Sequence, residues 1–255
     1  MKPALNEKDS GLPTDWHQFG QGELLAEHIN QLLQPWWQQI FGYYLLKVGD
    51  LSSALDSRSC KAQHHINIGY NTNNALIKGQ ADALPIRSLS VDAVLLAHSL
   101  EFVSDPHHVV REAHRVLMPD GYLIITGVNP ISLVGALSAM PWLHSKFPWS
   151  GRFFSISRVK DWLHLVGFEV LSEQRFFCST MLGSKQLKDK AEQSMADAKL
   201  QAWVEKYLAW FGASYLLVAR KRELPLTPIR PKWQLTPQYA NQVKGVSARQ
   251  GSTNN

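Results

Sequence analysis

Several polar residues follow directly on apolar runs of this sequence, and two of them could take part in chemistry. His98 follows VDAVLLA and could act as a base or orient a substrate hydroxyl, unless it is packed as a buried histidine. Asn129 follows YLIITGV and offers both a hydrogen-bond donor and an acceptor. Gly49 and Asp50 follow LLKV in the same manner. If these runs are parallel strands, the residues after them gather at one edge of a sheet.

The segments that would position these residues alternate between strand-like and helix-like patterns. Helices are expected over 24–37 from an apolar stripe, over 106–117 with Asp105 as N-cap, and after Ser157 as N-cap up to Gly167. Strands are expected at 45–48, 65–68, 91–96, 122–126, 168–171 and 214–221, and a polar helix over about 185–210. This alternation predicts an open α/β sheet with helices on both faces.

The block from Ala81 to Pro130 carries an ordered set of motifs. Its residues are Asp82, Leu84, Pro85, Val91, Asp92, Glu112, Arg115, Val116, Leu117, Pro119 and Gly121. Over residues 42–222 the sequence resembles the class I S-adenosylmethionine-dependent methyltransferases that act on small molecules, of the type 11-like group. The resemblance implies S-adenosylmethionine as cofactor. It also implies a Rossmann-like seven-stranded sheet, mostly parallel with an antiparallel last strand and helices on both faces.

The glycine-rich cofactor loop of that family is altered here, in the stretch LKVGDLSS. Lys47 stands where the family has an acid, and Gly49 matches the first of three glycines, while the other two are replaced. Lys47 would bring a positive charge toward the cofactor's sulfonium, unless it pairs with Asp50 or favours an anionic ligand. Asp50 and Ser52 are expected to supply the missing contacts. The loop residues expected to bind the cofactor are therefore Lys47, Gly49, Asp50 and Ser52.

Two later turns complete the cofactor site that the resemblance implies. Gly69 ends the second strand, where the family has an acid that binds the ribose hydroxyls. Without that acid, two hydrogen bonds to a charged group are lost, each worth about 1.5–3 kcal/mol, so cofactor binding is expected to be weakened. Asp82 is expected to accept a hydrogen bond from the adenine amine, and the backbone of Ala83 to contact the ring. The alternative for Asp82 is an Asx turn.

The altered loop leaves three interpretations open. The first is a working methyltransferase in which Asp50, Ser52 and Asp82 bind the cofactor. The second is a methyltransferase-like fold that binds another ligand, and the third is a descendant that has lost catalysis and serves as a binding or partner protein. We favour the first, because the second half of the family pattern is kept. Methyl transfer relies on positioning, and a base such as His98 helps only when the accepting atom must lose a proton.

An aromatic-rich segment, 128–155, follows the fourth strand and is interpreted as a lid. Asn129 and Trp142 are its candidate substrate contacts. The segment could close over a bulky apolar molecule, rest on a membrane surface, or pack under the N-terminal helix. Because no motif for amino acceptors in DNA or protein occurs, we expect an apolar small-molecule substrate and no DNA partner.

Composition favours a cytoplasmic protein without a metal centre. The two cysteines are too few for a disulfide framework, no metal-ligand spacing occurs, and the N-terminus has no apolar signal region. The expected domains are a disordered N-terminus over 1–15, a methyltransferase-like domain over 16–222, and a basic disordered tail over 223–255. Residues 221–255 hold six of the 26 Lys and Arg and one of the 21 Asp and Glu, so the net charge of +5 belongs to this end.

Overall fold

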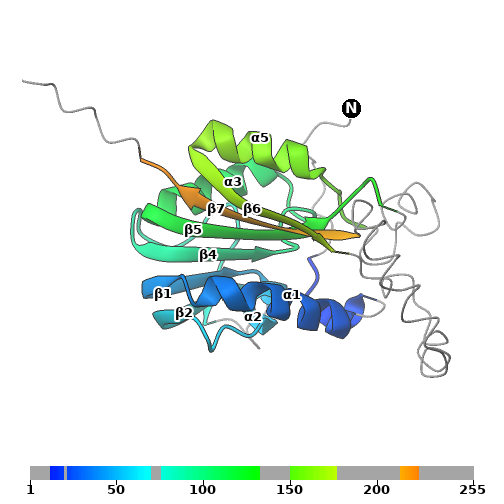
Figure 1. The fold of residues 1–255 in the computed structure, drawn as a ribbon, viewed down its shortest axis with the longest axis horizontal. Coiled ribbons are helices and arrows are strands. Elements are labelled where there is room, and N and C mark those ends of the chain that lie inside the picture. The colour runs from blue at the N-terminus through cyan, green and yellow to red at the C-terminus, as the bar shows by residue number, and fades with distance from the viewer. Residues whose placement is uncertain (1–11, 20–21, 70–75, 133–149, 177–212, 224–255) are drawn as a thin grey trace, which may run out of the picture. The chain divides into compact units, whose positions relative to one another are not determined.

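The computed structural model describes residues 12–19, 22–69, 76–132, 150–176 and 213–223, which contain a seven-stranded sheet in the order β3-β2-β1-β4-β5-β7-β6 (Figure 1). The strands are β1 (Phe41–Val48), β2 (Lys61–Gly69), β3 (Ile77–Lys78), β4 (Val91–Ala97), β5 (Leu117–Val128), β6 (Phe168–Phe176) and β7 (Ser214–Lys221). Strands β1 to β5 are parallel, and β7 runs antiparallel to both of its neighbours. The predicted Rossmann-like sheet with an antiparallel last strand is confirmed.

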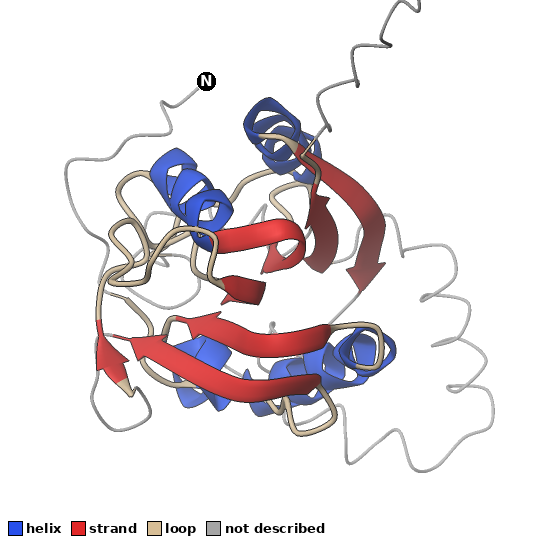
Figure 2. Cartoon of the chain, turned by 90° about the vertical axis from the view of Figure 1, so that its left-hand side faces the viewer, coloured by secondary structure: helices blue, strands red, loops and turns tan. Residues whose placement is uncertain are grey.

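Helices cover both faces of this sheet, which is why its central strands are apolar throughout (Figure 2). One face packs against α1 (Gly22–Trp37) and α2 (Asp50–Ala54), and the other against α3 (Pro106–Val116) and α5 (Ile156–Val166). Neighbouring residues of one strand divide between these two cores. Leu45 belongs to the α1 side and Leu46 to the α3 side, and both are fully buried.

The helix ends follow local signals in the sequence. Asp105 caps α3 by accepting an amide hydrogen bond in the first turn (3.1 Å), and Pro106 is the first helical residue, as predicted. Gly167 ends α5 with a φ of 103°, which confirms the predicted left-handed cap. The N-cap of α5 is Ser155 and not Ser157, because the hydroxyl of Ser155 accepts the first-turn amide (3.4 Å).

A strand residue closes the carboxyl end of α3. Lys221, the last residue of β7, is 2% exposed, and its Nζ donates hydrogen bonds to the carbonyls of His114 (3.1 Å) and Leu117 (3.0 Å). A cation at this place satisfies carbonyls that the helix leaves unpaired and compensates the negative end of its dipole.

The remaining elements differ from expectation mainly in length. Strands β1 and β2 each begin four residues earlier than predicted, and β3 was not predicted. The expected helix over 185–210, the centre of the proposed lid (133–149) and the basic tail lie outside the described residues. Within the described ranges, no helix combines the length and apolar character needed to cross a bilayer.

Candidate functional site

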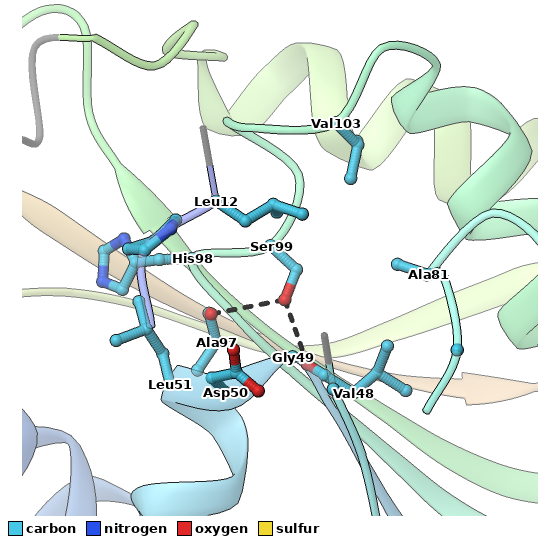
Figure 3. Close-up of a pocket in the computed structure, with 13 residues that line it drawn as sticks. Leu12, Val48, Gly49, Asp50, Leu51, Ala81, Ala97, His98, Ser99 and Val103 are labelled. Carbon is cyan, nitrogen blue, oxygen red and sulfur yellow. Dashed lines mark hydrogen bonds between the residues drawn. The ribbon is translucent and has the colours of Figure 1, made fainter. Parts of the chain in front are cut away.

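A hollow opens at the carboxyl ends of β1, β2 and β4 (Figure 3). It is lined by residues at these strand ends, among them Gly49, Gly69 and Ala97, and also by Ala81 and by Leu12 of the N-terminal segment. The strand order reverses between β1 and β4, which lie side by side. A ligand crevice is expected at such a reversal in an open α/β sheet.

Gly49 makes the sharp turn from β1 into α2. Its φ of 92° lies in a region that L side chains rarely adopt, and a Cβ there would lie 3.1 Å from Ser99 Oγ. The next residue, Asp50, begins α2, is 5% exposed and lines the hollow beside Gly49 (Figure 3). The turn therefore brings a carboxylate and a bare stretch of backbone to the same wall.

Lys47 is not part of this wall. Its side chain is 6% exposed, and Nζ donates hydrogen bonds to the carbonyls of Ser53 (3.2 Å) and Leu55 (3.0 Å), at the far end of α2. Burial lowers the pKa of this amine, and the charge of Asp56 opposes that shift. The lysine closes the carboxyl end of α2 as Lys221 closes that of α3, so the structure gives no support to a contact between Lys47 and the cofactor.

Ser52, also expected at the cofactor, is a structural residue. Its fully buried hydroxyl donates to the carbonyl of Val48 (2.6 Å) and accepts from the amide of Ala97 (2.7 Å). These bonds tie α2 to the ends of β1 and β4. Ser99 stands on the hollow side instead, and its hydroxyl donates to the same Val48 carbonyl at 3.1 Å (Figure 3).

The other residues predicted for the cofactor lie on or beside the hollow. Gly69 lines it, and residues 70–75, which follow directly, lie outside the described part of the chain. Ala81 lines it as well, whereas Asp82 and Ala83 follow on the same turn without forming the wall. Asp82 is half-buried and Ala83 is exposed. The structure thus places the predicted adenine turn at the rim.

This turn is fastened to α3 by an ion pair. Arg115 donates to the carbonyls of Leu84 (3.0 Å) and Ile86 (2.9 Å), and Glu112 accepts from the amide of Leu84 (3.1 Å). The two side chains pair with each other at 2.8 Å, and this hydrogen bond lowers the pKa of Glu112. The motif residues of α3 therefore hold the backbone that follows Asp82.

His98 lines the hollow in an energetically unfavourable conformation and environment. It is 1% exposed, and its φ of 48° is in the left-handed region. Its Nδ1 lies 3.3 Å from Glu101 Oε1, and its buried Nε2 has no hydrogen-bond partner among the described residues. An unpaired buried polar atom costs about 1–3 kcal/mol, and such backbone strain a similar amount. Costs of this kind are typical of functional sites.

Glu101 is a site residue that the sequence did not indicate to us. It is 2% exposed, and its Oε1 also accepts the amide hydrogen of Val128 (2.8 Å). Gly127 leaves room for it, because a Cβ there would lie 3.0 Å from Oε1 and would collide with Tyr215 Oη. Burial, and then the charge of Glu101, raise the pKa of Tyr215 well above its usual value. The available signal was a carboxylate three residues after His98 in an apolar stretch.

The N-terminal segment 12–19 forms a roof over His98. Trp16, in the short helix η1 (Trp16–Gln18), meets the imidazole edge-on at a centroid distance of 5.7 Å, and Phe19 lies 5.9 Å away. Trp16 Nε1 donates to the carbonyl of Leu51 at 3.1 Å, which anchors the roof to α2. The first four residues of this segment had been assigned to the disordered N-terminus.

The expected substrate contacts receive no support from the described residues. Asn129 is 3% exposed, and its Oδ1 accepts the amide hydrogen of Ile131 (3.1 Å), so its side chain shapes the turn after β5. It is not among the residues that line the hollow, so its role as a substrate contact stays a prediction. Trp142 lies outside the described residues.

Residues 42–125, which run from the second residue of β1 into β5, match a family described as a methyltransferase domain. The chain is 35% identical over 227 residues to the uncharacterized protein YafS of Escherichia coli K12, which is 89% of this chain and 88% of that protein. It is also 35% identical over 85 residues to the ubiquinone/menaquinone biosynthesis C-methyltransferase UbiE of Hahella chejuensis, which is 30% of this chain and 34% of UbiE.

A solved structure shows the same arrangement of elements. It is a SAM-dependent methyltransferase from Archaeoglobus fulgidus, with a TM-score of 0.53 and 15% identity over 78% of this chain and 94% of that one. At this identity the likeness concerns the fold. The part of the chain that matches the family model contains nearly all of β1, β2 and β4, and the carboxyl ends of these strands form the hollow.

Proposed function

Because the chain belongs to the class I S-adenosylmethionine-dependent methyltransferases, we propose that it methylates an apolar small molecule at the hollow beside β1, β2 and β4. The observation that carries the proposal is the direction of Lys47. Its amine is bonded to carbonyls at the far end of α2, so it brings no positive charge to the place where a sulfonium cation would bind. The altered loop is therefore compatible with the cofactor.

The residues present fit S-adenosylmethionine in charge and in space. Asp50 places a buried carboxylate on the wall that a cationic ligand would meet, and Gly49 and Gly69 present backbone without a side chain to the hollow. Asp82 stands at the rim, where its carboxylate would reach the adenine, with Ala83 beside it. When bound, the cofactor supplies an activated methyl group. The protein contributes orientation and exclusion of water.

The acceptor we propose has an apolar body. The hollow is walled by aliphatic side chains, among them Leu12, Leu51 and Val103, and the aromatic roof of Trp16 and Phe19 lies beside it. His98 is one of the polar side chains that line the hollow, with Asp50 and Ser99, and we assign it the role of base. Apolar walls with a few placed polar groups are the usual composition of small-molecule sites.

Calorimetric titration of the full chain with S-adenosylmethionine and S-adenosylhomocysteine tests the proposal. We expect the native protein to bind both, and Asp50→Asn to bind about tenfold or more weakly, because a hydrogen bond to a charged group is worth about 1.5–3 kcal/mol. Asp82→Asn should show a smaller loss. Asp161→Asn, on the exposed face of α5, is the matched control and should bind as the native protein does.

A native protein that binds neither ligand would contradict the proposal. It would favour the alternative of a descendant without catalysis that serves as a partner protein. Binding that Asp50→Asn leaves unchanged would contradict the assignment of the buried carboxylate, though not the family's cofactor.

A further inference from the structure

We propose that Glu101 holds the proton of His98 on Nδ1 and so keeps Nε2 as a proton acceptor, which directs the enzyme to acceptors that react through a hydroxyl oxygen or an acidic carbon. The inference rests on the proposed function and deepens it by naming the substrate class. Glu101 acts through His98, so it is a positioning residue, whereas His98 is the group that meets the substrate.

The tautomer follows from the hydrogen bonds around Glu101. Its Oε1 accepts the amide hydrogen of Val128 at 2.8 Å, so this oxygen faces donors. His98 Nδ1 lies 3.3 Å from the same oxygen and must donate to it. A neutral imidazole carries one proton, so Nε2 is left with its lone pair. The order of groups, carboxylate then imidazole then reacting atom, is that of a histidine base oriented by an acid.

The surroundings of Nε2 select for an apolar acceptor with a proton to lose. The atom is buried and has no partner among the described residues. Its ring is covered by Trp16 and Phe19, neither of which carries a charge, and the adjoining wall includes Leu12. An acceptor without a transferable proton, such as a thioether or a tertiary amine, would gain nothing from this lone pair.

The step balances with the groups named. The O–H or C–H bond of the acceptor breaks, its proton goes to Nε2, and its electron pair forms the new bond to the methyl carbon. When bound, S-adenosylmethionine would supply this methyl carbon, and the broken carbon–sulfur bond would leave its electron pair on the sulfur of a neutral thioether. The imidazolium that forms faces the carboxylate of Glu101, which compensates its charge in a buried place.

Nuclear magnetic resonance of nitrogen-15 histidine reads the tautomer directly. Two-bond proton–nitrogen correlations of the full chain, recorded between about pH 5 and pH 9, show which ring nitrogen carries the proton. The His98 signals are those that disappear in His98→Gln, and exposed His108 is the internal reference. We expect neutral His98 to be protonated on Nδ1.

Two substitutions separate the charge of Glu101 from its hydrogen bond. Glu101→Gln removes the charge and keeps an accepting oxygen, so the proton of neutral His98 should stay on Nδ1. Glu101→Ala removes the acceptor, so part of the population should move its proton to Nε2. Glu169→Gln, at an exposed ion pair, is the matched control and should leave the His98 signals in place.

Two results would overturn the inference: an Nε2–H tautomer in the native protein, or a tautomer that Glu101→Ala leaves unchanged. If the Glu101 variants do not fold, the native tautomer decides. An Nε2–H tautomer in a protein that binds S-adenosylmethionine would overturn this inference and leave the proposed function standing. The expected tautomer in a protein without cofactor binding would overturn the proposed function.

The substrate class is tested with methyl-labelled S-adenosylmethionine and pairs of acceptors on one apolar skeleton. One member of each pair carries a phenolic hydroxyl or an acidic carbon, and the other a thioether or a tertiary amine. We expect label in the first members only, and a reduced kcat in His98→Gln. Label confined to the second members would overturn the assignment.

Discussion

Replacing Lys47 by methionine should destabilise the fold without affecting the cofactor. Methionine fills a similar volume but cannot donate to the carbonyls of Ser53 and Leu55, which lie 3.2 and 3.0 Å from Nζ. Two hydrogen bonds from a charged donor contribute about 1.5–3 kcal/mol each. Relief of the amine's desolvation offsets part of this loss, so we expect a net destabilisation of about 1–3 kcal/mol.

Urea unfolding followed by circular dichroism measures this loss. The midpoint should fall at unchanged slope, because the surface exposed on unfolding stays the same. Lys61→Met is the matched control, since Lys61 is exposed at the start of β2, and should change stability by less than about 0.5 kcal/mol. A Lys47→Met protein as stable as the native one, or one with altered affinity for S-adenosylmethionine, would refute the direction assigned to this side chain.

The same lysine gives the fold a dependence on pH whose sign can be stated. Burial lowers the pKa of Lys47 below its ordinary 10.5, so between the lowered value and 10.5 the unfolded chain binds more protons than the folded one. The contribution of Lys47 to stability therefore rises with pH in that window. The difference in unfolding free energy between native protein and Lys47→Met should widen as the pH is raised through it.

Two further outcomes are expected. Arg115→Met should weaken S-adenosylmethionine binding by about tenfold in calorimetry, because the turn after Asp82 loses the hydrogen bonds to the carbonyls of Leu84 and Ile86. Arg111→Met, at an exposed position, is the control. Equal binding by the two variants would contradict the role of Arg115 in holding this turn. Tyr215 should stay un-ionised above about pH 10, where ordinary tyrosines titrate, as read by ultraviolet absorbance. Because its folded pKa is raised, its contribution to stability is complete below about pH 10 and is lost as the pH rises further; ionisation together with the exposed tyrosines would disprove its burial.

The fold could be predicted from the sequence because its elements carry local signals. Apolar runs on both faces mark central parallel strands, and Asp105 and Gly167 mark helix ends through their own backbone chemistry. Strand β1 was predicted too short because its first half is exposed and aromatic, with Phe41 75% and Tyr43 63% exposed. Ser155 and Ser157 offer equivalent hydroxyls, and only the backbone direction distinguishes them.

The site was predicted less completely, for reasons of direction and distance. Alternation along β1 puts Lys47 on the same face as Leu45 and on the opposite face from Leu46. This alternation predicts the direction of the lysine, whereas the alignment with the family's cofactor loop suggested the wrong one. The role of Glu101 depends on the amide of Val128, 27 residues later, and on the space that Gly127 leaves. No local pattern contains such a pairing.

Lys221, the last residue of β7, stabilises both the sheet and a helix. Its backbone pairs with Phe168 at the start of β6. Its amine donates hydrogen bonds to the carboxyl end of α3, which lies far earlier in the sequence. A protein cut back to Arg220 would keep nearly the whole strand and still expose two carbonyl oxygens of the helix end. A shortened chain should therefore keep Lys221 if the carboxyl end of α3 is to stay hydrogen-bonded.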